Sequence, residues 1–401
     1  LPALNSENLV DDLKEMAIRV EGEGDGVFNS SDFVLFYGQG PHVVYYDSLL
    51  SRFRHRLNIY SDKNYYFITY GGVLGKRVSD QISTTAPATN TVSVFDDFKF
   101  YEKEKVNLIK SGQLWLGEAY DVTNNYQFSF DFPNIDNSQQ AILEASYFVR
   151  SGVSSRIDFG IGGSNFTMSL GAVNLNGYIG AFASEGRSIY SFLPSSSNIV
   201  INTSYNKPQA SSKAWLNFLS INVKRRLIFS GSQYGFRSVN SVGVNEVSNF
   251  TIAGQLQNAV VWDATNPFNV KNQIFTRNGS SIQFSVETPE LREFVIFEDA
   301  DNGVVFEGAV ENQNLHQLSN LDYVIVSHPL FTEHAEQLAN FHSNDGLRVK
   351  VVSPEQIYNE FSAGSQDPVA IRSFLRMLYQ KATVPANLPK YLLLYGDGSY
   401  D

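Results

Sequence analysis

Two carboxylates follow an apolar run near the end of the sequence. The segment Gly396-Asp397-Gly398-Ser399-Tyr400-Asp401 comes directly after a predicted strand. Ligands of open α/β sheets bind beyond the carboxyl ends of the strands, so Asp397 and Asp401 lie where a site would form. His328 holds the same position after an earlier predicted strand. The alternative is structural, because Gly-Asp-Gly is a common turn and a lone histidine often belongs to a turn or a core.

A second group of carboxylates, in residues 21–32, has the spacing of a calcium-binding loop. Oxygen-bearing side chains fall at loop positions 1, 3, 5, 9 and 12, and glycine falls at position 6. The candidate carboxylate ligands are Glu21, Glu23, Asp25 and Asp32. Glu replaces Asp at positions 1 and 3, Asp replaces Glu at position 12, and the flanks predict strands where such a loop has helices. Calcium is one expectation, and an acidic hairpin turn with a DG dipeptide is the other. No further cofactor is expected.

The sequence offers little for hydrolytic chemistry. It contains no cysteine, which excludes a thiol nucleophile, a disulfide and a thiolate metal site within these 401 residues. No serine-hydrolase elbow, zinc-protease helix or S-x-x-K pattern stands out, and no phosphate-binding loop lies between a strand and a helix.

Length and charge narrow the class of protein. A chain of 401 residues with 43% hydrophobic residues predicts two or three packed domains. The net charge of −11 disfavours nucleic acid, whose binding depends on Lys and Arg neutralising phosphates. The first residues lack the basic and apolar blocks of a signal peptide, so we expect any export signal to lie upstream.

Up to about residue 315 the hydrophobic pattern has a period of two. Phe128-Ser129-Phe130-Asp131-Phe132 alternates cleanly, and similar short runs recur with polar turns between them. Many strands at this spacing predict a β-sandwich or jelly-roll-like architecture. We expect a small β-rich region at 1–92 and a β-sandwich-like domain at 93–318.

From residue 319 the pattern changes to alternating strands and helices. The predicted order is strand, helix, strand, helix, strand, at 322–327, 333–342, 347–352, 369–382 and 390–395. Ser353-Pro354 adds an N-cap with proline at the first helical position. This order predicts a parallel sheet with right-handed crossovers in residues 319–401.

Several stretches form an ordered set over nearly the whole chain: residues 33–41, 111–118, 261–265, 312–316, 355–361, Asp367 with 370–372, and 391–401. Together they resemble the gingipain-type cysteine peptidases, and within them the sortases of type IX secretion. It implies that residues 319–401 are the first, truncated part of a caspase-like α/β peptidase domain, and that the preceding residues form the family's β-rich N-terminal portion.

The same resemblance implies an activity for the parent protein. Such an endopeptidase removes the C-terminal secretion signal of cargo proteins and transfers the cargo to anionic lipopolysaccharide. The expected partners are this cargo, an outer-membrane component of the secretion system (PorV-like) and the lipopolysaccharide acceptor. The expected location is the cell surface or outer membrane of a Bacteroidetes-type bacterium, after export.

The family's catalytic histidine and cysteine follow the Gly-Asp-Gly strand, so both are expected beyond Asp401. His328 does not correspond to that histidine, and these 401 residues alone are expected to be inactive. The alternative is a non-enzymatic, β-rich surface module that binds a partner, cargo or glycan.

Overall fold

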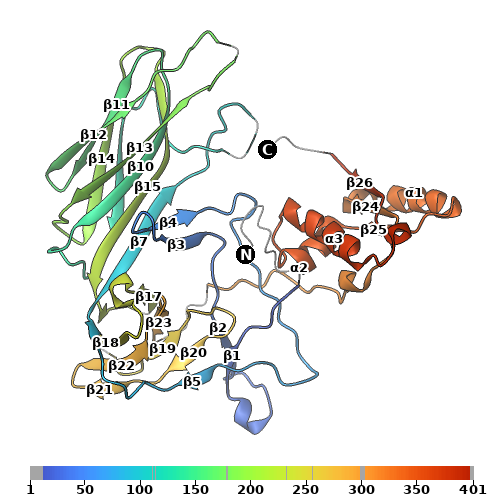
Figure 1. Ribbon diagram of the computed structural model, residues 1–401, viewed down its shortest axis with the longest axis horizontal. Helices are drawn as coiled ribbons and strands as arrows, with labels where there is room; N and C mark the ends of the chain where they lie inside the picture. Colours follow the sequence, from blue (N-terminus) through green and yellow to red (C-terminus); the bar gives the residue numbers. More distant parts are fainter. Residues whose placement is uncertain are drawn as a thin grey trace.

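The computed structural model describes residues 12–110, 112, 114–177, 179–231, 233–254, 256–298 and 303–397. Strands account for 41% and helices for 13%, which confirms the expected mainly-β chain followed by an α/β region with a parallel sheet. Figure 1 follows the chain from blue N-terminal hairpins through a green sandwich to the orange and red α/β region. Within these described ranges no helix is long and apolar enough to cross a membrane.

The first β-sandwich consists of two antiparallel sheets. One sheet has the order β13-β10-β15-β7, with β8 also paired to β15, and the other has the order β12-β11-β14-β9. The strands are β7 (Val94–Glu102), β8 (Ala119–Tyr120), β9 (Asn125–Asp131), β10 (Ala141–Arg150), β11 (Ser155–Ile161), β12 (Ser164–Leu170), β13 (Ser184–Phe192), β14 (Asn198–Asn206) and β15 (Lys213–Arg226). Buried and outward side chains alternate along β9 and β14, so the inner faces share one hydrophobic core.

The second β-sandwich has sheets in the orders β16-β18-β22-β21, with β6 on β18, and β17-β23-β19-β20-β5. Its strands are β5 (Ser79–Gln81), β6 (Asn90–Val92), β16 (Ile228–Phe229), β17 (Gln233–Arg237), β18 (Val247–Gly254), β19 (Val260–Asp263), β20 (Lys271–Gln273), β21 (Thr276–Asn278), β22 (Ser281–Glu287) and β23 (Glu293–Phe297). A short helix, η2 (Val239–Ser241), precedes β18. Phe250, Phe284 and Phe294 lie at the centre of its separate core.

The region predicted as one sandwich, residues 93–318, therefore contains the separate hydrophobic cores of both sandwiches. The second sandwich also includes strands β5 and β6, which come from the predicted 1–92 region and pair in parallel with β20 and β18, respectively. An all-β sequence repeats the same period-two pattern throughout, so that pattern does not mark where the chain leaves one core and enters the next.

Two hairpins precede the sandwiches. The first pairs β1 (Ile18–Glu21) with β2 (Phe33–Phe36) around a short helix, η1 (Glu23–Asp25), and Ala17 beside it joins the cluster around Trp262. The second hairpin pairs β3 (Val43–Asp47) with β4 (Arg52–Arg56). Figure 1 shows this hairpin beside β7, on the outer side of the first sandwich.

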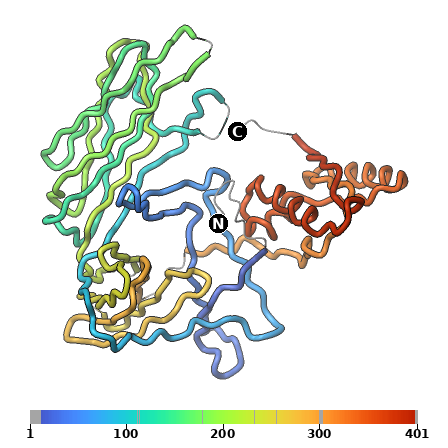
Figure 2. Tube along the Cα trace, in the orientation of Figure 1, coloured from blue at the N-terminus to red at the C-terminus, as the bar shows by residue number. Residues whose placement is uncertain are grey.

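The α/β region is a parallel sheet in the order β25-β24-β26. Its elements are η3 (Leu315–Gln317), β24 (Tyr323–Ser327), η4 (Pro329–Phe331), α1 (Thr332–Asn344), β25 (Val349–Val352), α2 (Pro354–Phe361), α3 (Pro368–Lys381), η5 (Pro385–Asn387) and β26 (Tyr391–Tyr395). Helix α1 packs on the sheet face that carries Ile325, and α2 and α3 pack on the face that carries Val324 and Val326. Figure 2 shows the chain reaching this region through an extended orange segment, of which residues 303–314 are described.

Local sequence explains where these helices begin. Ser353 and Gln356 form a reciprocal capping box at the start of α2, with Pro354 at its first position. Asp367 accepts the N–H of Val369 at the start of α3. Helix α3 was predicted at 369–382, whereas for α2 only the N-cap was predicted, so two helices lie between β25 and β26 where the predicted order had one. Both close over β24 to form its core.

Candidate functional site

The carboxyl ends of β24 and β26 meet at one edge of the parallel sheet. Ser327 is opposite Tyr395 in the strand register, and the N–H of His328 donates to the carbonyl of Tyr395 at 3.1 Å. Gly396 lies against the histidine, since a Cβ added to it would lie 3.7 Å from His328 Cβ. The structure thus brings His328 and the start of the Gly-Asp-Gly segment together.

His328 has a structural role at this edge. Its Nδ1 accepts the N–H of Leu330 at 3.2 Å, which caps helix η4. Its ring lies 6.0 Å from that of Phe331. These contacts correspond to the turn role that the sequence left open. Asp397 is exposed just beyond β26, and Asp401 lies outside the described residues.

A buried carboxylate joins the entry of the α/β region to helix α2. Glu360 accepts the N–H of Leu315 at 2.6 Å, the N–H of His316 at 3.1 Å and the side-chain amide of Gln313 at 2.8 Å. Its other close neighbour is His316 Nδ1, at 2.5 Å. Burial opposes ionisation, yet the hydrogen bonds from Leu315, Gln313 and His316 hold the pKa of Glu360 below its usual value. The stretches 312–316 and 355–361, both part of the sequence resemblance, are therefore in direct contact.

Asp322 lies at the opposite, amino end of the sheet. It pairs with Arg348 Nε at 2.7 Å and with Lys390 Nζ at 2.8 Å, and it accepts the N–H of Arg348 at 3.0 Å. One carboxylate therefore connects the starts of all three parallel strands. Hydrogen bonds from Arg348 and Lys390 outweigh burial and hold the pKa of Asp322 well below its usual value. This position stabilises the sheet and is remote from its carboxyl edge.

The acidic loop at 21–32 is folded by its own side chains. Asp25 accepts the N–H of Val27 at 2.9 Å, and Asp32 accepts the N–H of Asn29 at 2.8 Å. Glu21 pairs with Arg19, and Glu23 pairs with Arg77 at 2.8 Å. Within the part of the chain that the structure describes, no group of three or more His, Cys, Asp or Glu residues is arranged to hold a metal ion. Calcium binding here stays a prediction.

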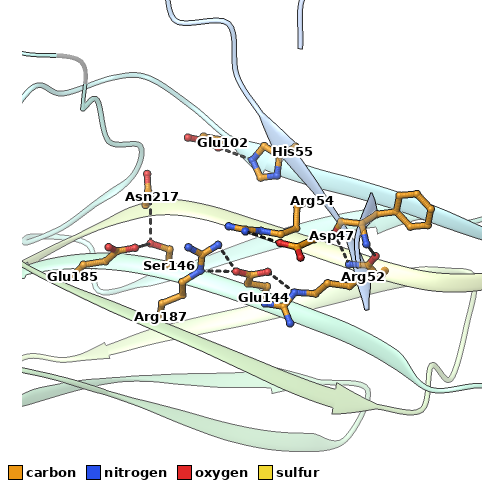
Figure 3. A network of polar contacts seen from close by, with 12 residues as sticks. Asp47, Arg52, Arg54, His55, Glu102, Glu144, Ser146, Glu185, Arg187 and Asn217 are labelled. Atoms are coloured by element: carbon orange, nitrogen blue, oxygen red, sulfur yellow. Dashed lines mark hydrogen bonds and ion pairs between the residues drawn. The ribbon is translucent and has the colours of Figure 1, made fainter. Parts of the chain in front are cut away.

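A larger network of polar contacts lies where the β3–β4 hairpin covers the first sandwich (Figure 3). Glu144, on β10, is 1% exposed and lies between two arginines. Arg52, from the hairpin, donates to its Oε2 at 2.9 Å, and Arg187, on β13, pairs with its Oε1. The backbone of Phe53 also exchanges two hydrogen bonds with the Asn222 side chain, at 2.7 and 3.1 Å.

A histidine completes this interface. His55 Nε2 lies 2.6 Å from Glu102 Oε2, and its ring stacks on Phe100 with centroids 3.9 Å apart. Figure 3 shows His55 pointing to Glu102, and Arg54 of the same hairpin pairs with Asp47 at 3.1 Å. The arrangement holds a hairpin in place by buried charge.

Sequence reasoning did not identify this cluster. One signal was present, since Glu144 interrupts the apolar run Ala141-Ile142-Leu143-Glu144-Ala145. A carboxylate in such a run must be paired or hydrogen-bonded once the strand is buried. Its partner Arg52 is 92 residues away in sequence, so the pairing itself is not visible in any local pattern.

Comparison with known proteins places this geometry in context. Residues 316–401 match the model of peptidase family C25, which begins where Glu360 binds η3. The crystal structure of dimeric latent PorU from Porphyromonas gingivalis aligns with 98% of this chain at 21% identity and a TM-score of 0.82. The chain has the fold of PorU. This confirms the resemblance to gingipain-type peptidases at the level of fold. The present chain spans 38% of the length of that PorU chain.

Other solved structures align with shorter parts of the chain. A CBM36 domain of a xylanase from the hindgut metagenome of Trinervitermes trinervoides is 14% identical and has a TM-score of 0.21; the alignment covers 31% of this chain and 95% of the domain. CBM35 from Cellvibrio japonicus Abf62 is 15% identical with the same TM-score, over 32% of this chain and 90% of that module. No match is found among the curated proteins.

Proposed function

We propose that this chain is the β-rich front and the first part of the peptidase domain of a gingipain-type cysteine endopeptidase. Two observations support the proposal. Residues 316–401 match peptidase family C25, and the PorU fold covers 98% of the chain. The β24–β26 pairing then forms the start of the catalytic sheet, and the edge that carries His328 and Gly396 faces the reaction centre.

The nucleophile of such an enzyme is a thiolate, activated by a histidine. The 401 residues contain no cysteine. We therefore expect the thiolate to come from residues outside this sequence, and the resemblance to gingipain-type peptidases implies the same for its histidine. The 401-residue chain alone should then cleave no peptide. The Ser327–His328 turn would contribute to the walls of the site and not to its chemistry.

The resemblance to PorU extends the proposal to substrates and location. The endopeptidase would remove the C-terminal secretion signal of type IX cargo and form a thioester with the shortened cargo. An amine on anionic lipopolysaccharide would then replace water as the acceptor, so that the cargo is transferred at the cell surface. A PorV-like outer-membrane protein would hold the enzyme there.

The decisive experiment compares this chain with the same chain extended by the residues that follow it in the natural protein. A cargo peptide that carries a C-terminal secretion signal is incubated with each, and the products are identified by mass spectrometry. We expect cleavage only by the longer protein, with iodoacetamide abolishing it. Cleavage by the 401-residue chain, or cleavage by the longer protein that resists iodoacetamide, would refute the proposal.

The calcium site predicted in residues 21–32 is retained as a proposal with its own test. If Ca²⁺ binds Glu21, Glu23, Asp25 and Asp32, a chelator lowers the melting temperature and added Ca²⁺ restores it. Glu23 would have to release Arg77 in order to bind the ion, so Arg77→Ala should tighten calcium binding. A melting temperature that does not change with chelator would contradict calcium binding at this loop.

A second function, a non-enzymatic surface module, is favoured by one observation. The two sandwiches have cores of their own, made from residues 92–296, without any contribution from the α/β region. A chain ending near residue 315 should therefore fold. Capture of cargo or the outer-membrane partner by that shorter chain would show that binding and catalysis belong to separate parts.

A further inference from the structure

A hollow of about 550 Å³ opens at one edge of the first sandwich. It lies between the β7–β8 end of one sheet and strand β9 of the other. The side chains that matter in it are Tyr101, Lys105, Glu118, Tyr126, Gln127 and Phe128. Glu118 closes the stretch 111–118 that contributed to the sequence resemblance, and nothing in the proposed peptidase activity uses it.

Glu118 is only 7% exposed, and only one of its two carboxylate oxygens accepts hydrogen bonds from other residues. Tyr101 and Lys105 both donate to its Oε1, at 2.5 and 2.6 Å. Its Oε2 is buried and accepts no hydrogen bond from another residue. Burial opposes ionisation of Glu118, but hydrogen bonds from Lys105, Tyr101 and its own backbone N–H hold its pKa below the usual value, so the group is a carboxylate and can only accept. An unfilled buried acceptor is costly, which points to a donor supplied by a ligand.

The surroundings decide which kind of donor fits. The Lys105 ammonium already neutralises Glu118, so a second cation would meet a like charge a few ångströms away. A neutral hydroxyl meets no such repulsion. The ring of Tyr101, packed 4.8 Å from the buried ring of Phe128, gives the hollow an apolar wall beside the carboxylate. A group with hydroxyls on its rim and C–H bonds on its face matches both features, and a sugar ring is such a group.

The hollow continues onto a wider polar surface. Tyr126 and Gln127 also line a second hollow of about 570 Å³ on the outer face of the β12-β11-β14-β9 sheet. Gln127 donates to Asn202 at 2.9 Å. Gly160 lies between Asn202 and Asn165 in the strand register, so no side chain fills the middle of the row. These amides are uncharged and both donate and accept, as saccharide hydroxyls do.

We propose that this edge of the first sandwich binds a neutral oligosaccharide. One sugar ring lies against Tyr101 and, once the Glu118 side chain turns its Oε2 toward the hollow, donates a hydroxyl to that oxygen. The next sugar lies over Gln127 and the Asn202–Gly160–Asn165 row. This assignment does not depend on the peptidase proposal, because it concerns the sandwich alone.

The test uses the 401-residue chain on an array printed with neutral oligosaccharides, acidic oligosaccharides and lysine-rich peptides. We expect retention on neutral oligosaccharides only. Glu118→Gln and Gln127→Ala should each weaken that retention by about tenfold or more, because each removes a hydrogen-bonding group from the ligand. Glu290→Gln, which neutralises an exposed carboxylate in the second sandwich, is the matched control and should bind as the wild type does.

Gln127 is exposed, so Gln127→Ala should fold even if Glu118→Gln does not. Circular dichroism shows which variants are folded, and Gln127→Ala then carries the comparison. The proposal is overturned if no neutral oligosaccharide is retained, or if retention survives in every folded variant. Retention of lysine-rich peptides in place of oligosaccharides, lost in Glu118→Gln or Gln127→Ala, would also overturn it, since the pocket would then select cations.

Discussion

Strands β10 and β26 are both rich in apolar residues, but their surroundings differ. Most of β10 is buried on both faces, because the sandwich core covers one side and the β3–β4 hairpin covers the other. No residue of β26 is fully buried, and Leu394 and Leu392 are 60% and 42% exposed. Both faces of β10 are therefore covered by other segments of the chain. In the described part of the parallel sheet, the edge strand β26 leaves apolar side chains exposed.

The comparison also concerns how a sheet face is covered. On β10 the covering hairpin is attached through charge, with Glu144 between Arg52 and Arg187. On the parallel sheet, α1 and the α2–α3 pair cover β24 through apolar contacts. A charged attachment is directional and is expensive to leave half made, whereas an apolar attachment tolerates small shifts. The two regions should respond differently to the loss of one side chain.

The largest effect is expected at Glu144. Replacing Glu144 with alanine leaves Arg52, 8% exposed, buried without its carboxylate. Breaking a buried ion pair in this way costs about 3–5 kcal/mol. Because the chain contains several cores, the measurement is amide hydrogen exchange of β10, which reports the local free energy of opening. Protection of β10 should fall, and protection of β24 should not.

The matched control is an exposed pair in the same sandwich. Arg156 and Asp158 are 54% and 38% exposed and lie 3.3 Å apart. Asp158→Asn should cost no more than about 1 kcal/mol, because solvent screens such pairs. If Glu144→Ala and Asp158→Asn lowered hydrogen-exchange protection equally, the hairpin would not be held by buried charge.

Much of this architecture could be predicted from the sequence because it depends on local patterns. The period-two alternation of residues 128–132, the N-caps at Ser353 and Asp367 and the change to alternating helices and strands after residue 319 each depend on a few consecutive residues. The juxtaposition of His328 with Gly396 follows from the rule that parallel strands end at one edge.

The rest depends on contacts between residues far apart in the chain. The partner of Glu144 on the hairpin is 92 residues away, and the division of 93–318 into two cores is not marked in the alternation. The environment of Glu118 requires Tyr101, 17 residues earlier on β7, to lie beside it, because β7 and β8 both pair with β15. Such pairings depend on strand order, which periodicity does not encode.

A smaller effect, with a pH dependence, is expected in the α/β region. Hydrogen bonds from Arg348 and Lys390 hold the pKa of Asp322 below that of an unfolded aspartate, about 4. A depressed folded-state pKa contributes stability that is present above the unfolded pKa and is lost as the pH falls through the folded one. Protection of β24 should therefore fall on acidification below about pH 4.

Asp322→Asn should remove about 1–3 kcal/mol at pH 7 and flatten that acid response. Hydrogen exchange of β24, measured at several pH values, reports both the loss of stability at pH 7 and the change in the acid response. Asp345→Asn is the matched control, since Asp345 is 61% exposed and lies 3.9 Å from His342. An acid response that is unchanged in Asp322→Asn would show that another carboxylate is responsible.

The smallest effect on stability is expected on the open face of β26. The double variant Leu392→Ser, Leu394→Ser should change protection of the sheet by less than about 0.5 kcal/mol, because both side chains are already in contact with water. Val326→Ser, opposite Leu394 in the register but 4% exposed, should cost several times more, because it places a hydroxyl in the core. An exposed apolar edge strand also favours association between copies, so sedimentation should show less concentration-dependent association for the double variant than for the wild type. If the double variant instead loses as much stability as Val326→Ser, β26 is covered in solution and the contrast with β10 disappears.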